Sequence, residues 1–454
     1  MKTFSEILAD YIHDLTYDDL PPAVITKCKQ IVMDTIGVMV FGSEAPWSRI
    51  LLDYFVEQGG TADAKIVCSD IHLPASSAAF VNGTMAHSFD YDDDLAACHI
   101  ASCIIPAVLA MGQKVKASGK ELITAITVGY DLTVRTAETL DGHHLYAMGF
   151  HPTPVCGVIG AVGAVSKLLK LDKEQIKCAF GIAGSFPSGS LEWLSDGSMT
   201  KRFHGGKAAS EGIISASLAQ KGFSAPRTAF EGENGIFKIY QVQRPEKTLV
   251  EELGQRFDVL KSYLKYYPCC TCNGPVIDAI LDLKERWSLQ HENIRKIEVK
   301  LRNTCFSLVG KPIEKKRNPD TILDAQMSAP YCIAVALLDG EAFPQQFTLS
   351  KLKDPTIKEI MQKISVEWDE SMELEGSPRP VPAEIVVLTT DGKELRKRVD
   401  YQKGTYRNPL TDDEIKMKFS MCVEGKFSET VRNQLITYID RLEYSPDVTQ
   451  IPTN

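Results

Sequence analysis

The hydrophobic pattern of this chain changes its period near Leu260, and this change constrains the fold more than any other feature. Before that point, apolar residues recur three or four positions apart, as in residues 24–37, which follow Pro21-Pro22. Asp172 with Gln175 three residues later has the pattern of a capping box. We therefore predict helices over residues 24–37, 121–138, 158–169, 173–183 and 211–220.

After Leu260, period-two alternation takes over. Residues 293–303 alternate apolar Ile294, Ile297 and Val299 with charged side chains, which predicts a half-buried strand. Two further strands, 383–389 and 393–399, are separated by Thr390-Asp391-Gly392, a hairpin signal. The pattern also predicts a strand over residues 364–368, a helix over 325–338 and a return to helix over 411–442.

The length of 454 residues exceeds the roughly 250–300 residues at which a single hydrophobic core stops growing. Together with the change of period, this predicts a mainly α protein: a large all-helical domain with a smaller inserted α+β lid domain. The large domain is expected to comprise residues 1–264 plus 406–454, and the lid residues 265–405.

Composition narrows the class of partner. The net charge of −9 argues against nucleic-acid binding, which favours a basic face. The start of the chain carries Glu6, Asp10 and Asp14 in place of a secretory apolar core, and the longest apolar run is too short for a membrane span. Twelve cysteines without a regular framework are typical of reduced thiols. These observations predict a cytoplasmic protein with no membrane or nucleic-acid partner.

Residues 86–102 hold an unusual density of ionisable groups: two imidazoles, His87 and His99, around four aspartates. Burying so many charges is costly unless they are paired or used. His87, Asp90 and Asp93 follow one another at intervals of three residues, so on a helical turn they would share a face, with Asp92 and Asp94 pointing elsewhere. This favours acid/base chemistry, while a solvated acidic turn is the structural alternative. A magnesium site is disfavoured because no second acidic motif is present.

A second polar segment, residues 199–209, supplies positive charge. It combines Lys201, Arg202, His204 and Lys207 with Gly205-Gly206, interpreted as a turn entering a helix. Helix N-termini and cations bind carboxylates, so the segment fits capture of an anionic substrate, although a solvated basic turn is the alternative. It is not a phosphate-binding P-loop, since the required spacing is missing.

Two other features bear on the site. Pro152 disfavours helix at His151, which places this imidazole on a loop at a helix entrance, either facing a cleft or as a structural histidine. The Cys269-Cys270-Thr271-Cys272 cluster lacks a second ligand pair for zinc and is interpreted as buried thiols. No dinucleotide fingerprint or serine-hydrolase elbow is present.

At this point the motifs resemble those of the MmgE/PrpD family, which includes 2-methylcitrate dehydratases, cis-aconitate decarboxylases and iminodisuccinate epimerases. The resemblance covers nearly the whole chain and rests on residues 80–83, 86–93, 98–102, 149–153, 199–204, 267–270 and 328–331. It implies a large helical domain with an α+β lid, a homodimer, and no need for a metal, nucleotide or flavin.

The resemblance also implies roles for individual residues in a cleft between the domains. The catalytic set is Asp90, Asp93, His99, His151 and Tyr331, and the substrate-binding set is Lys201, His204, His87 and Lys207, with no cofactor-binding or metal-binding residue. The chain departs from the family pattern at Ile100, where proline is frequent, and at Asn273-Gly274, where many members carry histidine after the cysteine pair.

The chemistry implied by the resemblance is formation and quenching of a carbanion or enolate beside a carboxylate of a small polycarboxylate. We rank dehydration of a 2-methylcitrate-like hydroxy acid first. Decarboxylation of a cis-aconitate-type acid and epimerisation of an iminodisuccinate-type acid follow. A non-catalytic carboxylate-binding protein and a metal-dependent phosphate-ester enzyme are the alternatives from other classes.

Overall fold

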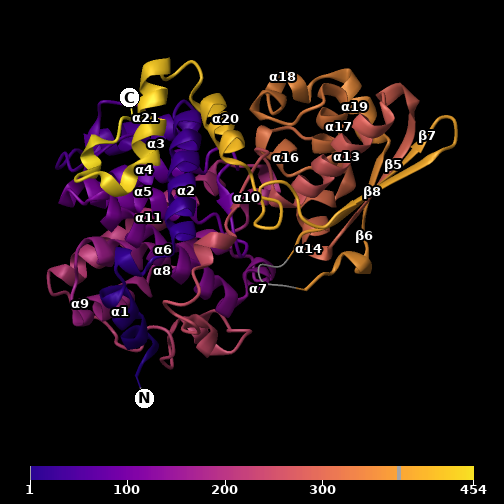
Figure 1. Cartoon of the computed structure of the whole chain (residues 1–454). Coiled ribbons are helices and arrows are strands. Elements are labelled where there is room, and N and C mark those ends of the chain that lie inside the picture. Colours follow the sequence, from indigo (N-terminus) through magenta and orange to yellow (C-terminus); the bar gives the residue numbers. More distant parts are fainter. Residues whose placement is uncertain (1, 376–379, 454) are drawn as a thin grey trace. The chain divides into compact units, whose positions relative to one another are not determined.

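The computed structural model describes residues 2–375 and 380–453 and contains two compact units (Figure 1). We call Met1–Ser88, Asp92–Ser262 and Thr411–Asn454 the helical unit. Phe89–Tyr91 and Tyr263–Leu410 form the sheet unit. The expected fold class is confirmed at the level of a mainly helical protein with a small sheet in its C-terminal part.

The helical unit is built from long helices with well-defined ends. Its longer helices are α1 (Phe4–Asp14), α2 (Pro22–Gly42), α3 (Pro46–Gln58), α4 (Ala75–Ala86), α5 (Ala101–Val115), α6 (Gly119–Leu140), α8 (Pro152–Leu168), α9 (Lys173–Ala183), α11 (Thr200–Gln220), α20 (Asp412–Val423) and α21 (Glu429–Asp440). The short elements are α7 (Gly142–Ala147), α10 (Trp193–Asp196), α12 (Ile236–Ile239) and strands β1 (Ala64–Lys65), β2 (His72–Leu73) and β3 (Asp93–Asp94).

Helix α11 occupies the centre of this unit, where it packs against α4, α5, α8 and α9. The two ends of the chain meet in the same core, because α20 lies along α2 although nearly four hundred residues separate them (Figure 1). A buried ion pair joins these two helices, with Lys418 Nζ 2.7 Å from Asp34 Oδ1. The C-terminal segment is therefore an integral part of the helical core.

Gly206 lets α11 approach α4 closely, since a methyl group on its Cα would overlap the backbone oxygen of Phe80. We expect Gly206→Ala to lower the free energy of unfolding by about 2 kcal/mol or more, because neither backbone can move away without opening the core. Urea denaturation measures this. Gly184→Ala is the matched control: its Cβ would come no nearer than 3.5 Å to another atom, so a change within about 0.5 kcal/mol is expected. Equal effects in the two variants would contradict the packing argument.

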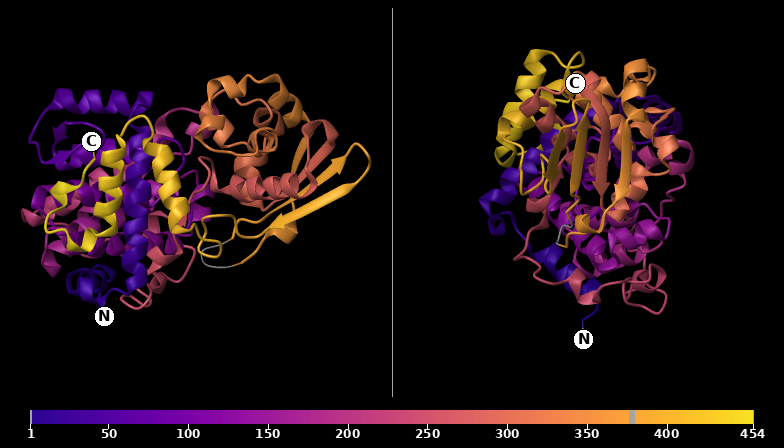
Figure 2. Two further views of the ribbon diagram at one scale, coloured as in Figure 1. Left: turned by 45° about the horizontal axis from the view of Figure 1, so that its top comes forward. Right: turned by 90° about the vertical axis from the view of Figure 1, so that its right-hand side faces the viewer.

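The sheet unit contains a four-stranded sheet of order β6-β5-β7-β8 (Figure 2, right). Its strands are β5 (Ile294–Leu301), β6 (Ile364–Trp368), β7 (Ala383–Thr389) and β8 (Glu394–Val399), and strand β4 (Tyr263–Leu264) lies outside this sheet. β5 runs parallel to β6 and antiparallel to β7, and β7 and β8 form the predicted hairpin, in which Gly392 has a φ of 85°. Helix α13 (Gly274–Trp287) packs on β7 and β8.

Besides α13, this unit contains further helices. They are α14 (Asn303–Cys305), α15 (Ile313–Lys316), α16 (Ile322–Gln326), α17 (Ala329–Asp339), α18 (Leu349–Leu352) and α19 (Pro355–Gln362). The longest of them, α17, packs against α13 and α19.

Most predicted elements are confirmed, and the errors have local causes. The predicted helix over 325–338 is wrong as one element, because Ser328 caps a new helix by accepting a hydrogen bond from the Tyr331 amide. The segment 411–442 is likewise two helices, α20 and α21. Gly205 and Gly206 lie inside α11 and do not form a turn before it. Within the two described ranges, no helix combines the length and apolar character needed to cross a bilayer.

Candidate active site

The polar segment after α4 does not form the predicted helical turn. The helix ends at Ala86 with His87 as its C-cap, and Asp90 adopts a left-handed backbone with a φ of 54°. This reversal destroys the three-residue spacing on which the shared face of His87, Asp90 and Asp93 depended. The prediction that Asp92 points away was wrong as well, because Asp92 turns its carboxylate toward the histidines.

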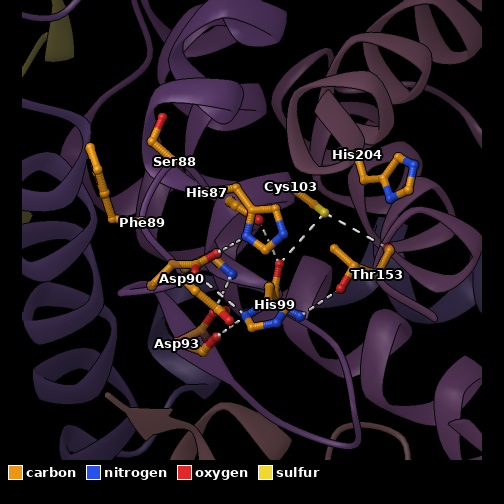
Figure 3. A network of polar contacts seen from close by, with 12 residues as sticks. His87, Ser88, Phe89, Asp90, Asp93, His99, Cys103, Thr153 and His204 are labelled. Carbon is orange, nitrogen blue, oxygen red and sulfur yellow. Dashed lines mark hydrogen bonds and ion pairs between the residues drawn. The ribbon is translucent and has the colours of Figure 1, made fainter. Parts of the chain in front are cut away.

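Asp92 joins two imidazoles in the interior of the helical unit. Its Oδ2 lies 2.8 Å from His87 Nδ1, and its Oδ1 lies 3.4 Å from His99 Nδ1. The two rings are close neighbours, with centroids 4.6 Å apart (Figure 3). All three side chains are buried, so the carboxylate acts in an environment where water screens little.

The burial and the mutual contacts of His87 and Asp92 determine their ionisation states. Burial lowers the pKa of His87 to about 3, and the neighbouring Asp92 only partly opposes this. Burial alone would raise the pKa of Asp92, but the two histidines outweigh it and hold the pKa of this carboxyl well below its usual range. At neutral pH the arrangement is therefore a carboxylate facing a neutral imidazole. Because the carboxylate only accepts, His87 donates from Nδ1 and keeps a lone pair on Nε2.

His151 and His204 form a second buried pair. His151 precedes Pro152 and is the N-cap of α8, which confirms its predicted place at a helix entrance. Its Nδ1 lies 2.9 Å from His204 Nδ1, and its Nε2 lies 3.2 Å from the Thr153 hydroxyl. Burial holds the pKa of His151 well below its usual range and lowers the pKa of His204 to about 4, so both rings are neutral at pH 7.

Thr153 links this pair to the first one. Its hydroxyl oxygen accepts a hydrogen bond of 3.0 Å from the His99 backbone N–H (Figure 3). The same hydroxyl forms the 3.2 Å hydrogen bond with His151 Nε2, in which the tautomer of His151 decides which group donates. His99 in turn holds the Asp93 carbonyl oxygen through Nδ1 at 3.0 Å. The four histidines are thus set in defined orientations.

Lys201 supplies a cation beside these rings. It lies in the first turn of α11 and is 3% exposed, and its Nζ lies 5.4 Å from the centre of the Trp193 ring. Its charge contributes to the lowered pKa of both His151 and His204. Lys207, one helical turn beyond His204, is engaged differently: its Nζ donates to Glu211 at 2.8 Å and to the Phe186 carbonyl at 3.1 Å.

Asp93 is held within the protein framework. Its Oδ1 accepts from the Ala101 amide at the start of α5, at 2.7 Å, and its Oδ2 accepts from Tyr130 at 2.5 Å and Ser262 at 2.9 Å. Burial raises the pKa of Asp93 to about 7, although these donors oppose the shift. The contacts explain how a buried carboxyl is accommodated, and its predicted proton-transfer role remains a prediction.

Within the sheet unit, Asp90 forms a buried ion pair with Lys265, at 2.6 Å between Oδ1 and Nζ. The sequence analysis missed Lys265. A lysine within the aromatic run from Tyr263 to Tyr267 was the available signal, because a buried ammonium group requires a partner. The ion pair provides Asp90 with a fixed cation.

The other sequence-predicted features of the sheet unit are also buried. The Tyr331 hydroxyl donates to the Gln346 carbonyl at 2.5 Å, so its predicted catalytic role remains a prediction. Asn273 donates to the Gln326 carbonyl at 2.9 Å. Cys269, Cys270 and Cys272 are buried thiols, as the sequence indicated.

The arrangement in the helical unit offers two chemical capabilities. A buried cation next to neutral imidazoles suits binding of a carboxylate and transfer of a proton to or from a neighbouring carbon. Three of the imidazoles, those of His87, His99 and His151, also lie close enough together to share a metal ion.

The amino-acid sequence is similar to that of one protein family along most of its length. The MmgE/PrpD N-terminal domain model matches residues 6–248, and the MmgE/PrpD C-terminal domain model matches residues 267–444. The chain is 27% identical to a human cis-aconitate decarboxylase, covering 100% of this chain and 94% of the relative. It is 26% identical to cis-aconitate decarboxylase of Aspergillus terreus, covering 96% and 93%. Because both family models match and together span most of its length, this chain belongs to the MmgE/PrpD family.

Proposed function

We propose that this protein is a cofactor-independent lyase that decarboxylates a small polycarboxylate of the cis-aconitate type. The observation that carries the proposal is the full-length similarity to several cis-aconitate decarboxylases. This evidence reverses the order suggested by the sequence alone, in which dehydration of a 2-methylcitrate-like acid came first. The cytoplasmic location and the homodimer, which the sequence and the resemblance suggest, remain part of the proposal.

Lys201 is the group proposed to bind a substrate carboxylate. It is a cation in a buried setting, where an ion pair with a carboxylate is worth more than at the surface. His87, His204 and Lys207 are proposed as further substrate contacts. Of these, His87 and His204 offer neutral ring nitrogens, whereas Lys207 is held by Glu211. We therefore assign the main electrostatic contribution to Lys201.

Decarboxylation leaves the electron pair of the broken C–C bond on carbon, and a proton must then be added there. His99 and His151 are the proposed proton donors. Thr153 hydrogen-bonds both residues, at the His99 backbone N–H and at His151 Nε2, and the charge of Lys201 acts on His151. A bound polyanion raises the pKa of a nearby imidazole, so substrate binding itself promotes protonation of His151, whose pKa is lowered by burial. Asp90, Asp93 and Tyr331 remain proposed as further proton-transfer groups.

A decarboxylase is expected to form a defined product and to incorporate deuterium from the solvent into it. Incubation with cis-aconitate in D₂O, without added metal, should release CO₂ and give a dicarboxylate that carries one deuterium at the carbon that lost its carboxylate or at its allylic position. Proton NMR follows both changes in one experiment. Appearance of a new alkene from citrate or 2-methylcitrate would instead establish a dehydratase, and exchange with inversion alone would establish an epimerase.

One observation favours dehydration as the second candidate. The buried Nε2 of His87 has no hydrogen-bond partner among the residues that the structure describes. As a lone-pair acceptor it suits a hydroxyl donor, which a hydroxy acid has and cis-aconitate lacks.

The alternative of a non-catalytic carboxylate-binding protein has its own signature. It would be supported if none of the acids reacted and one of them nevertheless raised the thermal stability of the protein.

A further inference from the structure

We propose that the imidazoles of His87, His99 and His151 form a binding site for a divalent transition metal ion of the zinc type. All three residues belong to the helical unit, and all three are buried. The site goes beyond the proposed function, which needs no metal. An ion bound there would occupy the same imidazoles that the reaction uses and would therefore inhibit.

The geometry of the three rings is close to that of a three-histidine metal site. One ligand nitrogen from each residue lies within 4.8 Å of one from each of the others. Their ring centroids are 4.6, 5.9 and 6.0 Å apart. Ligands about 2.1 Å from a tetrahedral ion lie about 3.4 Å from one another, so the rings need to shift inward by about 1 Å. Small side-chain rotations of His87, His99 and His151 provide a shift of this size.

His87 is oriented as metal-binding histidines are. Asp92 accepts from its Nδ1–H at 2.8 Å, which fixes the tautomer and leaves the lone pair on Nε2. This Nε2 is buried and, within the described part of the chain, receives no hydrogen bond. A carboxylate behind a ligating histidine also increases the basicity of the ligand nitrogen. The orphaned nitrogen is the independent indication that a ligand belongs at this position.

His151 can bind the metal ion with the loss of only one weak hydrogen bond. Its Nδ1 is held by His204, whereas its Nε2 has the longer contact, 3.2 Å, with the Thr153 hydroxyl. That hydroxyl can rotate away while its oxygen continues to accept from the His99 backbone N–H. Binding of an ion therefore sacrifices one weak hydrogen bond. His99 is steadied from its other side by the Asp93 carbonyl.

Charge and ligand type select the ion. The three ligands are imidazoles, and the carboxylate of Asp92, which contacts His87 at 2.8 Å and His99 at 3.4 Å, places a negative charge beside the site. Nitrogen ligands favour zinc, cobalt, nickel and copper over magnesium and calcium, which prefer oxygen. We expect Co²⁺ and Zn²⁺ to bind and Mg²⁺ not to.

The test titrates Co²⁺ into the full chain after treatment with a chelator and follows the visible absorption. We expect one Co²⁺ per chain with the bands of a four- or five-coordinate nitrogen site, displaced by one equivalent of Zn²⁺. His87→Gln, which removes a ligand, should weaken Co²⁺ binding by at least about 100-fold. Asp92→Asn, which removes only the group behind the ligand, should weaken it by about 10–100-fold.

The controls separate this site from others. His72→Gln removes an exposed histidine of β2 and should leave Co²⁺ affinity unchanged. Circular dichroism verifies that each variant is folded, and His151→Gln replaces His87→Gln if the latter is not. Weak Co²⁺ binding, affinity equal in wild type and both ligand variants, or the near-ultraviolet band of a cobalt–thiolate bond would overturn the proposal. Because the readout is binding and not turnover, it is independent of whether the decarboxylase proposal holds.

Discussion

Replacing Lys201 by Met is expected to lower kcat/KM for cis-aconitate by about 10²–10³-fold while the protein stays folded. Lys201 is a buried cation in the first turn of α11, beside His151 and His204. Methionine keeps the length and apolar stem of the side chain but removes the charge that binds a carboxylate and stabilises negative charge as it develops. Steady-state kinetics on the purified variant, with circular dichroism as a check of folding, measures the effect.

Two companion variants make this result specific. Lys173→Met removes an exposed lysine of α9 that pairs with Asp10 and Asp14, and it should leave kcat/KM unchanged. Lys201→Arg keeps the charge but changes its shape and should recover only part of the activity. Near-normal turnover of Lys201→Met would remove Lys201 from the proposed site.

Replacing Lys418 by Met should lower the free energy of unfolding by about 3–5 kcal/mol, the usual cost of removing one partner of a buried ion pair. Lys418 and Asp34 are each 1% exposed and lie 2.7 Å apart between α20 and α2. Without the ammonium group, Asp34 is left as a buried carboxyl that has lost its ion-pair partner. Urea denaturation gives the loss. Lys416→Met, on the same helix but in an exposed pair with Asp440, is the control and should cost less than about 1 kcal/mol.

The loss of unfolding free energy in Lys418→Met is expected to depend on pH in a definite direction. Burial raises the pKa of Asp34 above the usual value of an aspartate, and Lys418 opposes the shift. The folded state therefore binds the Asp34 proton more tightly than the unfolded chain, so the contribution of this group to stability falls as the pH rises through its folded-state pKa. Removing Lys418 raises that pKa further, so the deficit of Lys418→Met should be larger at pH 8 than at pH 5. A deficit independent of pH would contradict this explanation, and the double variant Asp34→Leu/Lys418→Met should recover most of the stability.

The elements that the sequence predicts correctly are those specified by local signals. Helix α9 and strands β6 and β7 have the predicted bounds, and the predicted capping box of Asp172 and Gln175 is present. Each of these signals acts over a few residues, because hydrophobic period, caps and turns are local properties of the chain. His151 belongs to the same class, since Pro152 alone directs it to a helix N-cap.

The errors at the candidate site have a common cause. The shared face assigned to His87, Asp90 and Asp93 assumed a continued helix, but the left-handed backbone at Asp90 turns Asp92 toward the histidines. Gly205 and Gly206 were interpreted as a turn because glycine favours turns, yet Gly206 is required where α11 crosses α4. In both cases a tertiary contact overrides the local preference.

The mainly helical architecture, the change to a small sheet, the family and most of the buried ionisable residues could be predicted from the amino-acid sequence. Tertiary structure alone decided their partners: Asp92 with His87, His151 with His204, Asp90 with Lys265, and Asp34 with Lys418. Periodicity and capping depend on the regular spacing of neighbours along the chain. Buried charges are paired by whichever side chains the folded backbone brings within about 3 Å, whether five residues apart, as for His87 and Asp92, or several hundred, as for Asp34 and Lys418.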